Sequence, residues 1–230
     1  MTVEDFAKLI DAITKLLSVF VWPFILIFIL IRFGPALQEF FANLGEISLK
    51  IAGIEASAKM KQAKAAAALA AAAVSHPKAG ATPEATAREA KAAVKIVSEA
   101  TTPKLLRRAA KSTILWVDDS PTNNVYERQS LEALGINIIE SKSTEDALEK
   151  IKQFHFDVII SDMGRPSDLK AGYTLLDKLR SAGNQTPFII YAGSRAPEHR
   201  AEALRRGAFG CTNRANELFE LVLSALGRQA

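Results

Sequence analysis

The sequence predicts an α/β fold for the C-terminal half of the chain, a doubly wound parallel sheet of five βα units with strand order 2-1-3-4-5. From residue 112 onward, short apolar runs typical of buried strands alternate with segments of helical periodicity. Aspartates follow two of these runs, at the strand ends where doubly wound sheets hold their sites. Before this half, the sequence predicts a membrane-spanning helix within 1–34 and a mostly helical linker over 35–111.

Each expected strand is short, apolar and followed by an expected helix. The strands are predicted at 114–117, 136–139, 156–161, 188–191 and 209–211. The helices are predicted at 124–134, 143–153, 172–181, 198–206 and 215–226, the second of them opened by a Ser143–Asp146 capping box. The domain that these elements form is placed at 112–230.

The net charge of +4 conceals a polarised chain. Residues 1–111 hold 15 Lys and Arg against 9 Asp and Glu, whereas residues 112–230 hold 14 against 16. The basic stretch 101–112 has no interleaved aromatic residues and no recognition motif follows it, so we expect no nucleic acid partner. The single cysteine, Cys211, excludes an intrachain disulfide and a Cys-rich metal site.

The N-terminal segment contains an uncharged apolar run at 16–31, which extends to a 21-residue span over 13–33. A run of this length fits one membrane-spanning helix, because Lys15 and Arg32 near its ends can reach the head groups. More Lys and Arg follow the run than precede it, which predicts that the C-terminal side faces the cytoplasm. A signal peptide, an interfacial helix over 3–17 and a buried core helix are the competing interpretations.

The middle of the chain is expected to be a linker. Residues 34–55 fit a juxtamembrane helix or a short hairpin, and their periodicity does not choose between the two. Residues 56–75 are rich in Ala and Lys and predict a helix with almost no large apolar stripe to bury. We expect it to be a solvated spacer or a weak self-association helix, with lysines that could contact anionic lipid. After the break at 76–84, Thr82 as N-cap and Pro83 predict a second helix.

Three aspartates follow the first and third predicted strands. Asp118 and Asp119 come after 114–117, and Asp162 comes after 156–161. Strands one and three are neighbours in a 2-1-3-4-5 sheet, so we expect the three carboxylates to converge. Converging carboxylates repel one another unless a cation lies among them, and oxygen-only ligands suit Mg²⁺. The chemistry that fits is phosphoryl transfer with one carboxylate as the nucleophile.

Three motifs occur in order along this half: ILWVDDSP at 114–121, DVIISDM at 157–163 and GYTLL at 172–176. Together they resemble the response-regulator receiver domain of two-component signalling, over about residues 112–228. The resemblance implies a flavodoxin-like fold. It implies the following site: Asp162 as the phosphoacceptor, Mg²⁺ held by Asp118, Asp119, Asp162 and the backbone carbonyl of Gly164, and Pro166 in the loop after the phosphoacceptor.

The sequence departs from the receiver pattern at the positions that read the phosphate. Ala192 stands where receivers usually carry Thr or Ser, which leaves Ser194 as the candidate hydroxyl. Arg214 replaces the usual Lys and is the second phosphate-contacting candidate. Cys211 occupies the position of the switch aromatic, for which Tyr191 is a candidate substitute. We therefore expect phosphate capture to be intact and its readout to be atypical.

These features predict a membrane-anchored receiver that takes a phosphoryl group on Asp162 and signals through protein contacts or self-association. It is expected to be no enzyme beyond self-dephosphorylation. The expected partners are a sensor histidine kinase or phosphotransfer protein, a second copy of the chain and membrane lipid, in the bacterial inner membrane with the receiver in the cytoplasm. The alternative is a phosphorylation-independent pseudo-receiver that acts as a membrane scaffold or assembly module. A phosphatase-type domain fits less well, because Asp118 and Asp119 are adjacent where it would want Asp-x-Asp.

Overall fold

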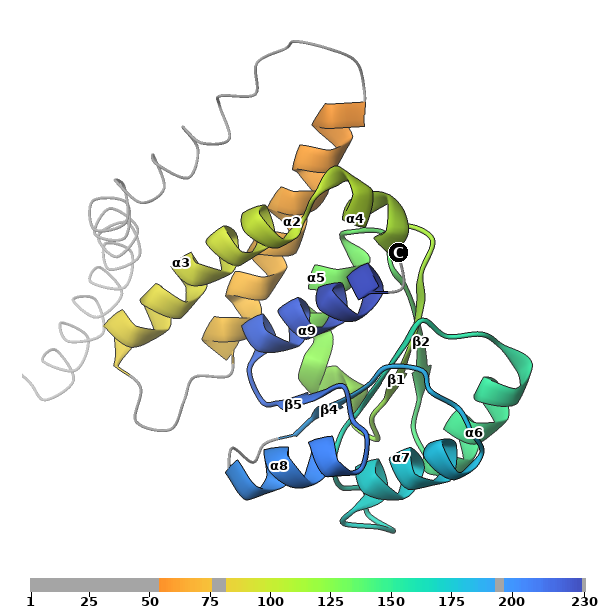
Figure 1. Cartoon of the computed structure of the whole chain (residues 1–230). Helices are drawn as coiled ribbons and strands as arrows, with labels where there is room; N and C mark the ends of the chain where they lie inside the picture. Colours follow the sequence, from red (N-terminus) through yellow and green to blue (C-terminus); the bar gives the residue numbers. More distant parts are fainter. Residues whose placement is uncertain (1–53, 76–81, 193–196, 229–230) are drawn as a thin grey trace, which may run out of the picture. The chain divides into compact units, whose positions relative to one another are not determined.

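The computed structural model describes residues 54–75, 82–192 and 197–228, which belong to one compact unit, Gly53–Ala230 (Figure 1). The membrane-spanning helix expected within 1–34 lies outside the described residues, as does Ser194. Within the described ranges, no helix combines the length and the apolarity that crossing a membrane requires.

A parallel sheet of five strands lies at the centre of the unit, in the order β2-β1-β3-β4-β5 (Figure 1). The order and the parallel pairing confirm the fold predicted from the alternating strands and helices. In register, Val117 of β1 lies beside Ser161 of β3, so the residues that follow these two strands begin side by side. The strands are β1 (Thr113–Val117), β2 (Asn137–Ser141), β3 (Val158–Ser161), β4 (Phe188–Tyr191) and β5 (Gly210–Thr212).

Helices cover both faces of the sheet, and each face has its own apolar core. Side chains alternate along β1, so Ile114 and Trp116 enter one core while Leu115 and Val117 enter the other. The first core is covered by α5 (Val125–Glu132), which follows the 3₁₀ helix η1 (Pro121–Asn124), and by α9 (Ala215–Arg228). The second is covered by α6 (Thr144–Gln153), α7 (Ala171–Ser181) and α8 (Pro197–Arg205).

Three further helices precede the sheet: α2 (Ile54–Ser75), α3 (Pro83–Ala100) and α4 (Pro103–Ala109). As the sequence predicts, Thr82 caps α3, where its side chain accepts a hydrogen bond from the amide of Ala85. α2 is not a solvated spacer. One stripe of it, which includes Ala65, Leu69 and Ala72, is buried in the core that α5 and α9 share. The small Ala side chains let this helix approach its neighbours closely, so it needs no row of large apolar residues to be buried.

Leu69 tests whether α2 stabilises the sheet domain. The side chain is fully buried, so Leu69→Ala is expected to lower the free energy of unfolding by about 2–4 kcal/mol. The measurement is urea unfolding of the full chain, in a mild nonionic detergent because of its apolar N-terminal run. Val74→Ala is the control on the same helix, because Val74 is 55% exposed and its loss should cost under about 0.5 kcal/mol. Equal unfolding of the two variants would mean that α2 does not belong to the core.

Candidate functional site

The ends of β1 and β3 bring three aspartates together. Asp118 and Asp119 follow Val117, and Asp162 follows Ser161 in the neighbouring strand. The amide of Asp162 donates to the carbonyl of Val117 at 3.0 Å, which holds the two strand ends in register. One carboxylate oxygen from each aspartate lies within 4.8 Å of the others. The convergence expected from the strand order is therefore present.

Two hydrogen bonds hold the carboxylate of Asp118. It is buried, and its Oδ1 accepts a hydrogen bond from the amide of Ser120 at 2.8 Å. Its Oδ2 accepts one from the side-chain amide of Asn124, at the end of η1. The turn that follows β1 therefore fixes the orientation of this carboxylate before any ligand arrives.

Burial and neighbouring charge act on Asp162. Burial raises the pKa of this carboxyl from 3.8 to about 6, with Asp118 and Asp119 adding to the rise and the nearby Arg165 opposing it. The raised pKa means that burial, together with the excess negative charge of Asp118 and Asp119, disfavours the ionised form of this carboxyl. A divalent cation would remove that excess, and three converging carboxylate oxygens are the donors that Mg²⁺ prefers. The donor set therefore fits Mg²⁺.

Arg165 contributes to this site, and no motif in the sequence predicts it as a site residue. Its side chain is only 3% exposed, and Nη2 lies 2.7 Å from Oδ1 of Asp162. Nη2 also donates to Oγ of Ser161 at 2.6 Å, and Nη1 donates to Oγ1 of Thr144 at 2.9 Å. The one feature of the sequence that could have indicated Arg165 is its position three residues after Asp162. A single sequence does not show that a charged side chain at that position is buried.

The loop after β3 has a defined conformation. The backbones of Arg165 and Asp168 exchange two hydrogen bonds, each 2.9 Å long, and close a turn around Pro166. The loop ends at Gly172, whose amide donates to the carbonyl of Met163 at 2.9 Å. A Cβ on Gly172 would lie 2.5 Å from the carbonyl oxygen of Asp162, so only glycine fits there. Gly164 lies in the same loop, and its role as a metal ligand stays a prediction.

The remaining candidates lie on β4 and after β5. Tyr191 is partly buried; its hydroxyl donates to Oε1 of Glu127 at 2.9 Å, and its ring meets Trp116 edge-on with centroids 6.2 Å apart. Ala192 follows directly, and its amide donates to the carbonyl of Thr212. Cys211 is buried in β5. The hydroxyl of Tyr191 is therefore bonded to α5 in this structure.

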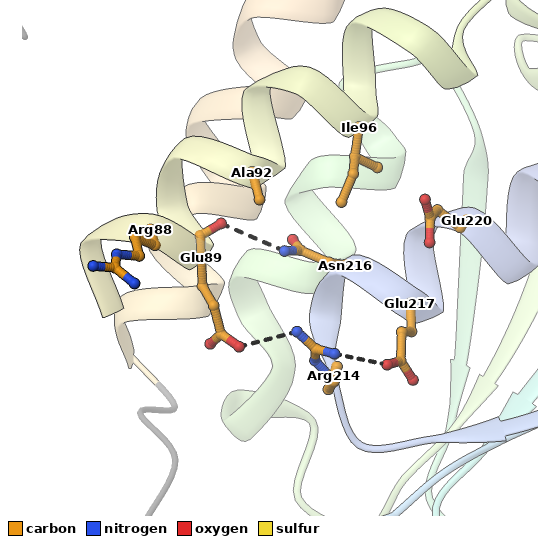
Figure 2. Close-up of a pocket in the computed structure, with 8 residues that line it drawn as sticks. All are labelled: Arg88, Glu89, Ala92, Ile96, Arg214, Asn216, Glu217 and Glu220. Carbon is orange, nitrogen blue, oxygen red and sulfur yellow. Dashed lines mark hydrogen bonds and ion pairs between the residues drawn. The ribbon is translucent and has the colours of Figure 1, made fainter. Parts of the chain in front are cut away.

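Arg214 is engaged with helix α3 and with α9. Its Nη2 lies 3.0 Å from Oε1 of Glu89, and its Nη1 lies 3.0 Å from Oε1 of Glu217 (Figure 2). Asn216 adds a long hydrogen bond of 3.5 Å to the backbone carbonyl of Glu89. These contacts line an open cavity between α3 and the start of α9, with Ala92 and Ile96 on the α3 side. The structure thus brings the three aspartates together. Arg214 does not pair with them, because its carboxylate partners are Glu89 and Glu217.

Comparisons with known proteins bear on the same part of the chain. Residues 114–223 match the family model of the response regulator receiver domain, and α2, α3 and α4 lie outside that match. The receiver domain of the Francisella response regulator 1452 is 23% identical, with 52% of this chain and 99% of that chain covered and a TM-score of 0.47. Chemotaxis response regulator CheY4 of Vibrio cholerae is 26% identical, with 52% and 98% covered and a TM-score of 0.43. A putative response regulator from Chloroflexus aurantiacus is 24% identical, with 51% and 98% covered and a TM-score of 0.47. No curated protein gives a significant match.

Proposed function

We propose that the receiver domain at residues 114–223 accepts a phosphoryl group on Asp162 in the presence of Mg²⁺, and signals through protein contacts or self-association. The observation that carries this proposal is the convergence of Asp118, Asp119 and Asp162, whose carboxylate oxygens lie within 4.8 Å at the ends of two neighbouring strands. Receiver domains are generally signalling domains rather than enzymes, and we propose a signalling role for this chain as well. The one reaction that it would catalyse is hydrolysis of its own phosphoryl group.

The proposed step is an in-line phosphoryl transfer. A carboxylate oxygen of Asp162 attacks the phosphorus of the donor and forms a new P–O bond, while the bond to the leaving group breaks and its electron pair departs with that group. Asp118, Asp119, Asp162 and the carbonyl of Gly164 would hold Mg²⁺. When bound, Mg²⁺ would neutralise negative charge on the phosphoryl oxygens. Burial and the charges of Asp118 and Asp119 raise the pKa of Asp162 to about 6, so a bound cation would favour its ionised, nucleophilic form.

The phosphate readout is proposed to involve Ser194, Arg214 and Tyr191. Arg214 would have to exchange Glu89 and Glu217 for the phosphoryl group, which would release α3 from the start of α9. Tyr191 would likewise exchange its hydrogen bond to Glu127 for a new position. These exchanges would connect the state of Asp162 to the helices that precede the sheet.

The proposed partners and location follow from the receiver assignment and the N-terminal sequence. A sensor histidine kinase or a phosphotransfer protein would supply the phosphoryl group, and a second copy of the chain would be the partner in self-association. The apolar run at 16–31 would anchor the chain in the bacterial inner membrane as a single span, in contact with lipid and with the receiver in the cytoplasm.

A second candidate function keeps the fold without the phosphate chemistry. The ion pair between Arg165 and Asp162 and the engagement of Arg214 by Glu89 favour a phosphorylation-independent scaffold or assembly module. In that case both cations would be permanent structural partners, and neither would respond to phosphate.

Phosphorylation of the full chain separates the two candidates. Incubation with acetyl phosphate and Mg²⁺, followed by a phosphate-affinity gel, is expected to give one shifted band that disappears in Asp162→Asn and without Mg²⁺. Asp177→Asn is the matched control, because Asp177 is an exposed carboxylate on α7 that pairs with Arg206, and it should keep the shift. No shift in the wild type would favour the scaffold. A shift that persists in Asp162→Asn would place the phosphoryl group on another residue.

A further inference from the structure

Arg165 carries a buried positive charge to which the proposed phosphoryl transfer assigns no role. Removing a guanidinium from water costs several kcal/mol, so a buried arginine persists where its donors find specific partners. The carboxylate partner of Arg165 is Asp162, 2.7 Å away, and two hydroxyls, Ser161 and Thr144, accept its remaining contacts. Its Nε is buried and has no hydrogen-bond partner among the described residues.

The loop holds this guanidinium in place. The backbones of Arg165 and Asp168 exchange two hydrogen bonds, so the residue cannot leave without opening the turn. Asp168 in turn accepts hydrogen bonds from the amide of Lys170 and the hydroxyl of Thr174, at 2.8 and 2.5 Å, which ties the turn to the start of α7. Thr144, the partner of Nη1, is the first residue of α6. The guanidinium of Arg165 is therefore positioned by its own loop, by α6 and by α7 before any phosphodonor binds.

The ion pair engages one oxygen of the phosphoacceptor. Arg165 contacts Oδ1 of Asp162, and a carboxylate needs only one of its two oxygens for nucleophilic attack. The hydroxyl of Ser161 accepts from Arg165 and donates to the backbone carbonyl of Asp162 at 2.9 Å. The same guanidinium thus forms an ion pair with the side chain of Asp162, whose buried Oδ1 has no hydrogen-bond partner among the described residues, and it reaches the main chain of Asp162 through Ser161. A carboxylate held in this way needs no reorientation at the moment of reaction.

The second basic candidate has other partners. Arg214 bonds to Glu89 and Glu217 with its two Nη atoms. The cation in contact with the phosphoacceptor is therefore Arg165, from the loop after β3, rather than Arg214, from the segment after β5.

We propose that Arg165 is a positioning residue for phosphoryl transfer, because it holds Oδ1 of Asp162 and leaves the second carboxylate oxygen for attack on phosphorus. This inference rests on the proposed function. The step is the one already described: a P–O bond to Asp162 forms, and with acetyl phosphate the bond to the acetate oxygen breaks and acetate leaves with the electron pair. Arg165 exchanges no proton or electron in this step and acts only through the carboxylate.

The proposal predicts opposite effects on two measurements. Arg165→Met should slow the formation of phosphoryl-Asp162 by about tenfold or more, because the carboxylate loses its fixed orientation. The same variant should bind Mg²⁺ several-fold more tightly, because removal of a positive charge beside Asp162 makes the acidic pocket more negative. A merely structural role would move both in the same direction, since a disrupted pocket loses both phosphoryl transfer and metal binding.

The experiment uses the full chain in a mild nonionic detergent. Phosphorylation by acetyl phosphate is followed on a phosphate-affinity gel, and binding of Mg²⁺ alone is measured by titration calorimetry. Arg165→Lys keeps the charge and should recover part of the rate, which also covers the case in which Arg165→Met fails to fold. Arg180→Met is the matched control, because Arg180 donates to the backbone carbonyls of Asn184, Thr186 and Gly207 and should affect stability alone.

The outcomes distinguish this inference from the proposed function. Slower phosphorylation with tighter Mg²⁺ binding in Arg165→Met, and partial recovery in Arg165→Lys, would support the positioning role. An unchanged rate, or a slower rate with unchanged or weaker Mg²⁺ binding, would overturn it while the proposed function stands. Absence of phosphorylation in the wild type would overturn both.

Discussion

Gly172→Ala is expected to lower the free energy of unfolding by about 2–3 kcal/mol and to disturb the acidic site. Helix propensity alone predicts the opposite, because Ala is favoured over Gly by about 1 kcal/mol within a helix. The steric term prevails because the added Cβ would lie 2.5 Å from the carbonyl oxygen of Asp162 and 3.2 Å from Cα of Met163. Both neighbours are backbone atoms, so either α7 or the end of β3 has to move.

A second glycine isolates the steric effect. Gly227 lies in α9, and a Cβ added there meets no atom of the described residues within 4 Å, so Gly227→Ala is expected to leave stability unchanged or to raise it slightly. Urea unfolding of the full chain in detergent measures both variants, and titration calorimetry with Mg²⁺ measures the site. Because the clash falls on Asp162 itself, Mg²⁺ affinity should drop in Gly172→Ala only. Two variants with the same unfolding curve would contradict the close approach of α7 to Asp162.

The sheet and the aspartate cluster were predictable because each depends on a local pattern. Strands such as 114–117 and 188–191 are continuous apolar runs, since helices cover both faces of a parallel sheet. The strand order then brings the residues after β1 and β3 together, so the positions of Asp118 and Asp162 in the sequence were enough to expect their convergence.

The role of α2 was not predictable in the same way. Its buried residues Ala65, Ala66 and Ala72 are chemically identical to Ala67, which is exposed, so the sequence holds little contrast between the two faces of the helix. The hydrophobic pattern that normally identifies a buried face is nearly absent. This helix is buried by packing against α3, α5 and α9, and two of these, α5 and α9, lie far along the chain.

The partners of the two arginines were also beyond a single sequence. Arg214 pairs with Glu89, 125 residues earlier, and such a contact leaves no periodic signal. Arg165 occupies a loop position where a charged side chain is ordinarily exposed. Its burial depends on Thr144 and Ser161, which reach it from α6 and β3. The three aspartates of the cluster could thus be predicted from the sequence. The contact of Arg165 with Asp162 could not.

The raised pKa of Asp162 predicts that the metal-free protein loses stability as the pH rises from about 4 to about 6. The carboxyl titrates near its ordinary value of 3.8 in the unfolded chain and at about 6 in the folded chain, so the folded state binds more protons between these values. Stability associated with the protonated form is present below pH 4 and is lost above pH 6. A difference of about two pKa units corresponds to about 3 kcal/mol.

Asp162→Asn isolates this contribution, because asparagine does not titrate and the other ionisable groups of the chain are the same in both proteins. Urea unfolding in EDTA at about pH 5 and at pH 7.5 is expected to show that the wild type loses about 1.4 kcal/mol more than the variant over that interval, because the rest of the loss falls below pH 5. Any cost of leaving Arg165 without its carboxylate partner is present at both pH values and cancels in the comparison. Addition of Mg²⁺ at pH 7.5 should restore stability to the wild type and affect the variant less, since a cation that binds the folded state stabilises it by mass action. If the stabilities of the wild type and of Asp162→Asn change with pH in the same way, burial does not raise the pKa of Asp162 in the folded protein.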